Sequence, residues 1–150
     1  MSDSKKDILR KDWESLKEFS QLHHLEEYKT SSNFNLKFLP NFLIRSSHQC
    51  FVKGKNIRSK IYAGMLYFIY RIEYTPKCKI EGGLVMPHPN SIIFGASDIG
   101  ENCVIFNEVT IGAKYPDPLF LKENRPSIGN NVLVNAGAII ANSVADILIC

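Results

Sequence analysis

The sequence predicts an α+β protein in which N-terminal helices precede a short left-handed parallel β-helix, a coil of short strands with three sides. Apolar residues keep a helical spacing through the first half of the chain. After residue 72, small aliphatic residues recur at a step of about six residues, which is one side of such a coil. We therefore expect a helical region over 1–72 and a β-helical region over 73–150, with one loop over 114–125 projecting from the coil.

The first predicted helix covers residues 7–19. Its apolar side chains share one face at helical spacing, with charged residues on the opposite face, and they are Leu9, Trp13, Leu16 and Phe19. The adjacent pair His23 and His24 follows. Neighbouring residues on a helix point in different directions, so this pair does not indicate a metal site.

Two more helices are predicted before the coil. Residues 30–35 are polar and indicate a loop, after which Pro40 opens a helix through Leu43 and Ile44. A third helix from Ile57 to about Tyr70 has apolar residues at four-residue intervals, namely Ile57, Ile61, Met65 and Ile69. The run 61–72 is too short to span a bilayer, so its length favours a buried helix, with a membrane-surface helix as the alternative.

The predicted coil starts near residue 73, where prolines and glycines exclude a long helix and β-branched residues become frequent. Aliphatic residues recur in paired positions at Ile99-Gly100, Ile105-Phe106, Ile111-Gly112, Ile128-Gly129 and Val134-Asn135. Between these pairs, the residues expected to point inward are Val104, Val109, Val132 and Ala138. The polar, proline-containing segment 114–125 interrupts the repeat, and loops on rigid scaffolds often cover active sites.

Charge and cysteine usage limit the class of protein. The net charge is +3, with 13 Lys/Arg against 8 Asp/Glu in residues 1–75 and 5 against 7 in residues 76–150. The basic half favours a solvated face over a site for phosphate-bearing ligands or an anionic surface, and no nucleic-acid recognition motif accompanies it. The four cysteines lack C-x-x-C spacing and the N-terminus lacks an apolar signal region, so we expect a reducing, cytoplasmic location.

His88 lies between two prolines, and the aliphatic repeat does not require it. Imidazole has an ordinary pKa near neutrality and is suited to removing a proton from a hydroxyl group. Glu73 lies 15 residues earlier, a spacing that we interpret as one coil back, where a carboxylate would orient the imidazole. The simpler alternative is a surface histidine at the edge of a coil.

The segments 73–112 and 125–138 resemble the serine acetyltransferase family of hexapeptide-repeat acyltransferases, which includes O-acetyltransferases from polysaccharide gene clusters. Three motifs carry this resemblance: the glycine-to-histidine element 83–88, the V-T-I-G segment 109–112 and the A-G-A segment 136–138. It implies that His88 is the general base and that Glu73 orients it. It also implies a homotrimer that uses acetyl-CoA as donor and needs no metal, and a coenzyme site formed by Gly112, Ala113, Ala136, Gly137 and Ala138.

The sequence departs from this family where the acceptor would bind. Pro87 stands where the family has aspartate, and Asn124-Arg125-Pro126 stands where it has Arg-His-Pro. The predicted function is therefore acetyl transfer to a sugar hydroxyl in surface polysaccharide biosynthesis, with Pro87, Asn124 and Arg125 near the acceptor. The alternatives are a serine O-acetyltransferase of cysteine biosynthesis and a catalytically impaired trimeric scaffold, because the repeat loses its register after residue 141. A metal-dependent hydratase would need several histidines on the coil, and His88 is the only one after residue 48.

Overall fold

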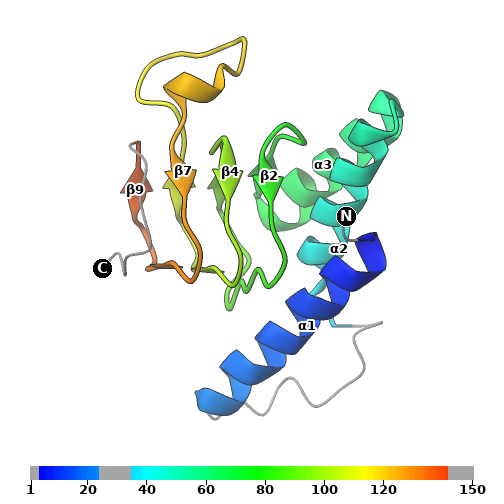
Figure 1. Ribbon diagram of the computed structural model, residues 1–150, viewed down its shortest axis with the longest axis vertical. Helices are drawn as coiled ribbons and strands as arrows, with labels where there is room; N and C mark the ends of the chain where they lie inside the picture. Colours follow the sequence, from blue (N-terminus) through cyan, green and yellow to red (C-terminus); the bar gives the residue numbers. More distant parts are fainter. Residues whose placement is uncertain (1–3, 24–34, 142–150) are drawn as a thin grey trace.

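The computed structural model describes residues 4–23 and 35–141, and Figure 1 shows three helices packed against one end of a coil of strands. The helices are α1 (Lys5–Leu22), α2 (Leu39–Val52) and α3 (Asn56–Tyr70). The strands and one short helix follow in the order β1 (Glu73–Tyr74), β2 (Lys79–Ile80), β3 (Ile93–Phe94), β4 (Asp98–Ile99), β5 (Val104–Ile105), β6 (Thr110–Ile111), η3 (Lys122–Asn124), β7 (Ser127–Ile128), β8 (Leu133–Val134) and β9 (Ile139–Ile140). The predicted α+β class is confirmed.

The strands form three parallel sheets that the chain visits in a fixed order. Sheet A contains β1, β3, β6 and β9, sheet B contains β2, β4 and β7, and sheet C contains β5 and β8. A parallel bridge between Val85 and Val104 extends sheet C by one residue into the first turn. Each turn of the chain therefore passes through A, B and C and stacks on the previous turn, and we call each such turn a coil.

The core of the coil consists of one inward residue from each strand. Each two-residue strand places its first side chain outward and its second inward, because successive side chains point to opposite faces. The aliphatic residues of the predicted pairs are at most 2% exposed: Ile99, Ile105, Ile111, Ile128 and Val134. Val109 and Val132 are also buried, whereas the inward position predicted for Val104 is wrong, because its side chain packs outward against α1.

The corners of the coil repeat the same backbone conformation in successive turns. Between sheets B and C, φ is +86° at Gly83 and +56° at both Asn102 and Asn131. Between sheets C and A, Ser91, Glu108 and Gly137 have φ values of 54°, 60° and 77°. Glycine and asparagine tolerate this left-handed region better than most residues, and the stacked corners keep the coils in register.

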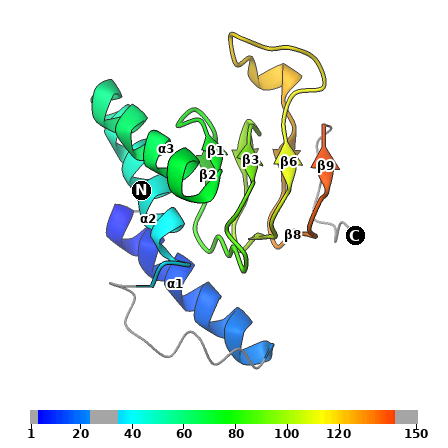
Figure 2. The same ribbon diagram turned by 180° about the vertical axis from the view of Figure 1, so that it is seen from behind.

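The helices cover the first coil. Leu16 of α1 and Phe38, just before α2, form a buried cluster with Val85, and the ring of Trp13 meets that of Phe38 edge-on at 5.1 Å. The predicted apolar face of α1 is confirmed by this cluster. In Figure 2, α3 lies in front of α2 beside β1. His23 is exposed and lies 4.4 Å from the Phe19 ring, whereas His24 is outside the described residues.

A buried ion pair connects the helices to the coil. Asp12 of α1 is fully buried and Arg45 of α2 is 5% exposed, and two hydrogen bonds of 2.9 and 3.0 Å join their side chains. Asp12 also accepts hydrogen bonds from the N–H groups of Gly83 and Leu84, at 2.8 and 3.0 Å. Arg45 donates to the carbonyl oxygens of Ile80 and Glu81. No earlier coil is present to pair with the backbone N–H and C=O groups of the first coil. Asp12 and Arg45 provide hydrogen-bond partners for four of these groups.

The prediction that the third helix is buried is wrong for its apolar stripe. Ile57, Ile61, Met65 and Ile69 are 78%, 57%, 40% and 55% exposed. The helix instead packs through its opposite side, where Leu66 is fully buried and the hydroxyl groups of Ser59 and Ser47 each donate to the other residue's carbonyl. None of the described helices is long and apolar enough to cross a membrane.

Replacing Asp12 with asparagine should lower the free energy of unfolding by about 3 kcal/mol, because the Arg45 guanidinium would remain buried without a countercharge. Urea denaturation followed by circular dichroism measures this change. The matched control is Glu14→Gln, since Glu14 is exposed and pairs with Arg10 at 3.9 Å, so its loss should cost less than about 0.5 kcal/mol. Equal effects of the two substitutions would contradict the role of the buried pair.

Candidate active site

His88 lies in a widened corner between sheets C and A. Equivalent positions in sheets C and A measure the length of this corner in each coil. From Val85 to Ile93 the first coil advances eight positions, whereas the next two coils advance six, from Val104 to Thr110 and from Leu133 to Ile139. The first corner therefore contains two additional residues. Because a regular coil does not need them, the corner can carry a side chain with a role outside the core.

The imidazole of His88 is exposed at this corner, while Pro87 and Pro89 on either side are buried. The prolines fix φ on both sides of the histidine, and the His88 carbonyl accepts a 2.8 Å hydrogen bond from the Asn90 N–H. The imidazole centroid lies 6.2 Å from the Phe106 ring, which belongs to the same corner of the next coil. The histidine is thus held on a rigid turn with its ring accessible to solvent.

Glu73 is the first residue of β1, with its side chain on the exposed face of sheet A. Its N–H group donates to the Ile92 carbonyl at 2.8 Å, so the glutamate and the His88 corner lie at the same end of this sheet. The interpretation of Glu73 as one coil back needs correction, because Glu73 pairs in register with Ile93 and begins the coil that His88 closes. None of the hydrogen bonds described for residues 4–23 and 35–141 joins Glu73 to His88.

The 114–125 loop leaves the coil at the opposite end of sheet A. It follows β6 and rejoins the coil at β7, and Figure 2 shows it at the top of the molecule while β8 of sheet C runs along the bottom. Arg125 lies at the base of this loop and donates to the Gly95 carbonyl at 2.9 Å, just after β3. Within one chain, His88 and Arg125 therefore lie beyond opposite ends of β3.

The guanidinium of Arg125 is held by the loop itself. It donates to the Asp117 carboxylate at 2.9 Å and to the Asp117 carbonyl at 3.0 Å, and it lies 3.8 Å from the centre of the Phe120 ring. The Arg125 side chain is 14% exposed and that of Asp117 is 3% exposed. No sequence motif indicates a role for Asp117 or Phe120, and the one signal for Asp117 is its place between two prolines.

The Asp117 carboxylate is stabilised in its charged form. Desolvation raises its pKa, but hydrogen bonds from the Leu121 N–H and from Arg125 outweigh this effect, so the pKa lies below its ordinary value. Asp117 therefore organises the loop by bonding to both its short helical turn and its base.

The small residues predicted to bind the coenzyme fall into two groups. Gly112 and Ala113 follow β6 next to the loop, whereas Ala136, Gly137 and Ala138 form the corner before β9, on the same side as His88. Open space surrounds Gly112 and Gly137 where a Cβ atom would be. The Gly112 N–H donates to the Ile140 carbonyl at 3.0 Å, so this amide is already used within the sheet and does not point freely to a ligand.

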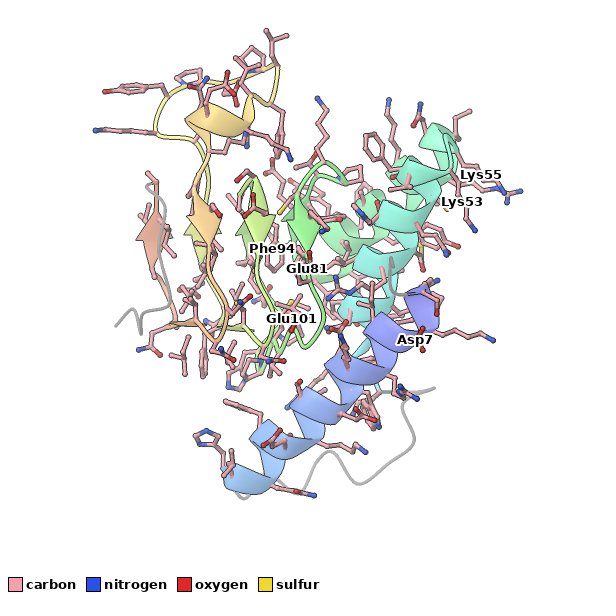
Figure 3. The ribbon with its side chains drawn as sticks, in the orientation of Figure 1. Asp7, Lys53, Lys55, Glu81, Phe94 and Glu101 are labelled. Atoms are coloured by element: carbon pink, nitrogen blue, oxygen red, sulfur yellow. The ribbon has the colours of Figure 1, made fainter. Side chains whose placement is uncertain are left out.

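Within the part of the chain that the structure describes, cavities border the coil beneath the loop and beside the helices. One, of about 340 Å³, lies under the loop and is lined by Lys114, Tyr115, Asn124, Arg125 and Ala141, among others. The other, of about 830 Å³, lies between the helices and the first two coils, on the side where Figure 3 shows Glu81 and Glu101. Its rim carries the ion pairs Lys79–Glu81 and Lys11–Glu101, and it contains none of the predicted site residues. The described residues contain no group of three or more potential metal ligands.

Replacing Asp117 with asparagine should loosen the loop, because the charge partner of Arg125 is lost. Hydrogen–deuterium exchange should become several-fold faster in the segment 114–125 and remain unchanged in the sheets. The pKa of Asp117 is lower in the folded protein than in the unfolded chain. Its contribution to the stability of the loop is therefore complete above the unfolded pKa of about 3.9 and is lost as the pH falls through the folded pKa. The control is Glu123→Gln, an exposed carboxyl in the same loop, and equal exchange in both variants would contradict this role.

Comparisons with known proteins point to one group of enzymes. No family model matches the chain. The chain is 33% identical over 78 residues to a serine acetyltransferase of Helicobacter pylori, which covers 51% of this chain and 44% of the relative. It is 27% identical over 99 residues to the serine acetyltransferase of Staphylococcus xylosus, covering 65% and 44%. The chain thus spans less than half the length of these curated relatives.

Solved structures show the same similarity at the level of the fold. The crystal structure of Neisseria gonorrhoeae serine acetyltransferase in complex with serine matches 94% of this chain and 56% of that chain, with a TM-score of 0.76 and 18% identity. Soybean serine acetyltransferase without ligand matches 95% and 56%, with a TM-score of 0.75 and 19% identity. The predicted resemblance to the serine acetyltransferase-like hexapeptide-repeat acyltransferases is confirmed.

Proposed function

We propose that this protein, a chain similar to the serine acetyltransferases, is an acetyl-CoA-dependent O-acetyltransferase with L-serine as its acceptor. The observation that carries this proposal is the exposed imidazole of His88, fixed between buried prolines in a corner two residues wider than the corners above it. The names of the matching relatives support serine over a sugar as acceptor. The sugar acceptor predicted from the sequence has no support from the comparisons.

In this reaction, His88 removes the proton from the acceptor hydroxyl as its oxygen bonds to the carbonyl carbon of the acetyl group. Acetyl-CoA supplies the thioester, whose carbon–sulfur bond breaks as the new ester forms. The protonated His88 then returns the proton to the departing sulfur, so the histidine is unchanged at the end. Glu73, at the same end of sheet A, orients His88 in this proposal and stabilises the imidazolium.

The residues present fit the pantetheine arm of coenzyme A. A chain of methylene and amide groups needs close access to backbone, and side chains larger than methyl would block it. Gly112 and Gly137 leave open space where a Cβ atom would be, and Ala113, Ala136 and Ala138 add only methyl groups. We propose that these five residues contact the donor. The hydrogen-bond donor in this proposal is the Ala113 amide rather than that of Gly112, since no hydrogen bond from the Ala113 N–H is found within residues 4–23 and 35–141.

A complete site requires a second copy of the chain in this proposal. Gly112, Ala113 and the loop lie at one end of sheet A, while His88 and Ala136–Ala138 lie at the other. When identical coils associate side by side around a symmetry axis, the His88 end of one copy approaches the loop end of its neighbour. We therefore propose a homotrimer with its active sites between copies.

The acceptor contacts differ from those expected for a free amino acid. Pro87 is buried and offers neither charge nor N–H, and the Arg125 guanidinium is engaged by Asp117. We propose that Arg125 positions the loop, and that Asn124, which is exposed on the cavity wall, contacts the acceptor.

The finer description of the fold belongs to the same proposal. We infer that the coil is a left-handed β-helix, with a helical region over 1–72 and an acyltransferase region over 73–150. Among the described residues, Cys50, Cys78 and Cys103 form no disulfide, and reduced thiols suit the reducing, cytoplasmic compartment that we propose.

Replacing His88 with alanine should reduce kcat/KM by two to four powers of ten, because the general base is lost. Release of coenzyme A thiol from acetyl-CoA in the presence of L-serine measures the rate. His23→Ala is the matched control, since His23 is an exposed histidine on α1, and it should keep full activity. Full activity of the His88 variant would contradict the assignment.

The same thiol assay distinguishes the acceptors. L-serine should be acetylated at least tenfold faster than hexoses or hexosamines at equal concentration. The reverse order would favour the hypothesis that the acceptor is a sugar hydroxyl. If no acceptor reacts, isothermal titration with acetyl-CoA separates the alternatives. Heat of binding would indicate an enzyme with another acceptor, whereas its absence would favour a non-catalytic scaffold.

A further inference from the structure

The outward side of α3 is an apolar surface that the fold leaves uncovered. Ile57, Ile61, Met65 and Phe68 lie on one side of the helix, and they are 78%, 57%, 40% and 86% exposed. We call these four residues the α3 outer face. Apolar stripes on helices of globular proteins normally point toward the core, so this exposed stripe indicates a binding surface.

The segment that contains the α3 outer face carries positive charge and no carboxylate of its own. Residues 28–72 contain eight Lys/Arg and no Asp or Glu. Five of these cations lie in or beside α3 and are exposed, and none takes part in the ion pairs described for residues 4–23 and 35–141: Lys53, Lys55, Arg58, Lys60 and Arg71. Figure 3 shows Lys53 and Lys55 at the outer end of the helices, away from the strands.

The cations border the apolar stripe on both sides. At 100° per residue, Arg58 lies on one flank of the α3 outer face and Lys60 on the other. Lys53 and Lys55 precede the first turn of the helix, and Arg71 follows its last turn. An exposed apolar stripe with cations along its flanks can contact acyl chains and phosphate groups at the same time.

The charge distribution argues against a second copy of this chain as the occupant. Two α3 outer faces packed together would bring Arg58 and Lys60 of each copy close to like charges, with no carboxylate between residues 28 and 72 to compensate. Anionic phospholipids provide both required components, since acyl chains accept the apolar side chains and phosphate groups attract the flanking cations.

We propose that α3 binds the surface of an anionic phospholipid membrane, with Ile57, Ile61, Met65 and Phe68 inserted at the boundary between headgroups and acyl chains. The helix lies parallel to the membrane plane and does not cross it. Lys53, Lys55, Arg58, Lys60 and Arg71 contact lipid phosphates. This inference does not depend on the acetyltransferase activity and would make the protein a peripheral membrane protein.

The full chain should float with vesicles that contain phosphatidylcholine and phosphatidylglycerol, and binding to phosphatidylcholine alone should be at least tenfold weaker. Raising the salt to about 1 M should release most of the protein, because the Debye length falls to about 3 Å. Replacing Ile61 and Phe68 together with serine should reduce partitioning at least about tenfold. Arg58→Gln with Lys60→Gln should reduce it by more than tenfold, at about fivefold for each cation.

The matched controls lie on α1, where Leu22 is 72% exposed and Lys17 is also exposed. Leu22→Ser and Lys17→Gln should leave binding unchanged, and circular dichroism melting should show that all variants fold, because every replaced side chain faces solvent. Equal binding to both vesicle types would overturn the proposal. The proposal would also be overturned if the full chain did not bind vesicles and the Ile61/Phe68 variant differed in mass from the unaltered chain by light scattering. The α3 outer face would then be an interface between copies.

Discussion

The buried pair of Asp12 and Arg45 is the constraint on which the arrangement of helices and coil depends. A coil of parallel strands ends in backbone groups that have no earlier turn to pair with. Here the Asp12 carboxylate accepts from two N–H groups of the first coil, and the Arg45 guanidinium donates to two of its carbonyl groups. The helices therefore terminate the coil through hydrogen bonds, and Leu16 and Phe38 add apolar contact beside them.

This arrangement also places the candidate active site. Gly83 receives one of the Asp12 hydrogen bonds, and the chain then runs through Val85 to the widened corner that carries His88. The first coil is anchored at Gly83 by the Asp12 hydrogen bond and at Val85 by the bridge to Val104. The two additional residues of the corner can therefore project as a rigid turn rather than as a flexible loop. The catalytic histidine in our proposal is thus supported by the same contacts that close the end of the coil.

The α3 helix shows how tertiary packing reverses a sequence pattern. Its regular stripe of Ile57, Ile61 and Met65 has the spacing of a core-facing surface. The structure instead uses the opposite side, where Ser59 and Ser47 exchange hydrogen bonds and allow α2 and α3 to approach closely. Paired serines contribute little to a hydrophobic pattern, so periodicity alone selects the wrong side of the helix.

The sequence by itself determined the order of the helices and coil, most of the inward aliphatic residues, with Val104 as the exception, and the location of the projecting loop. These features depend on local periodicity and on residues such as proline and glycine, whose conformational limits act within a few positions. Asp12 lies within the apolar sector of α1, between Leu16 and Phe19 on the helix surface. This position indicates a buried carboxylate, but it does not identify Arg45 as the partner.

Only the tertiary structure decided which groups meet. The pairing of Asp12 with Arg45, the engagement of Arg125 by Asp117 and the separation of His88 from the loop all depend on contacts between distant segments. The registers of the coils vary with the length of each corner, so sequence spacing placed Glu73 one coil too early relative to His88. Side-chain partners in a coil follow the stacking of turns, and a residue count along the chain does not contain that stacking.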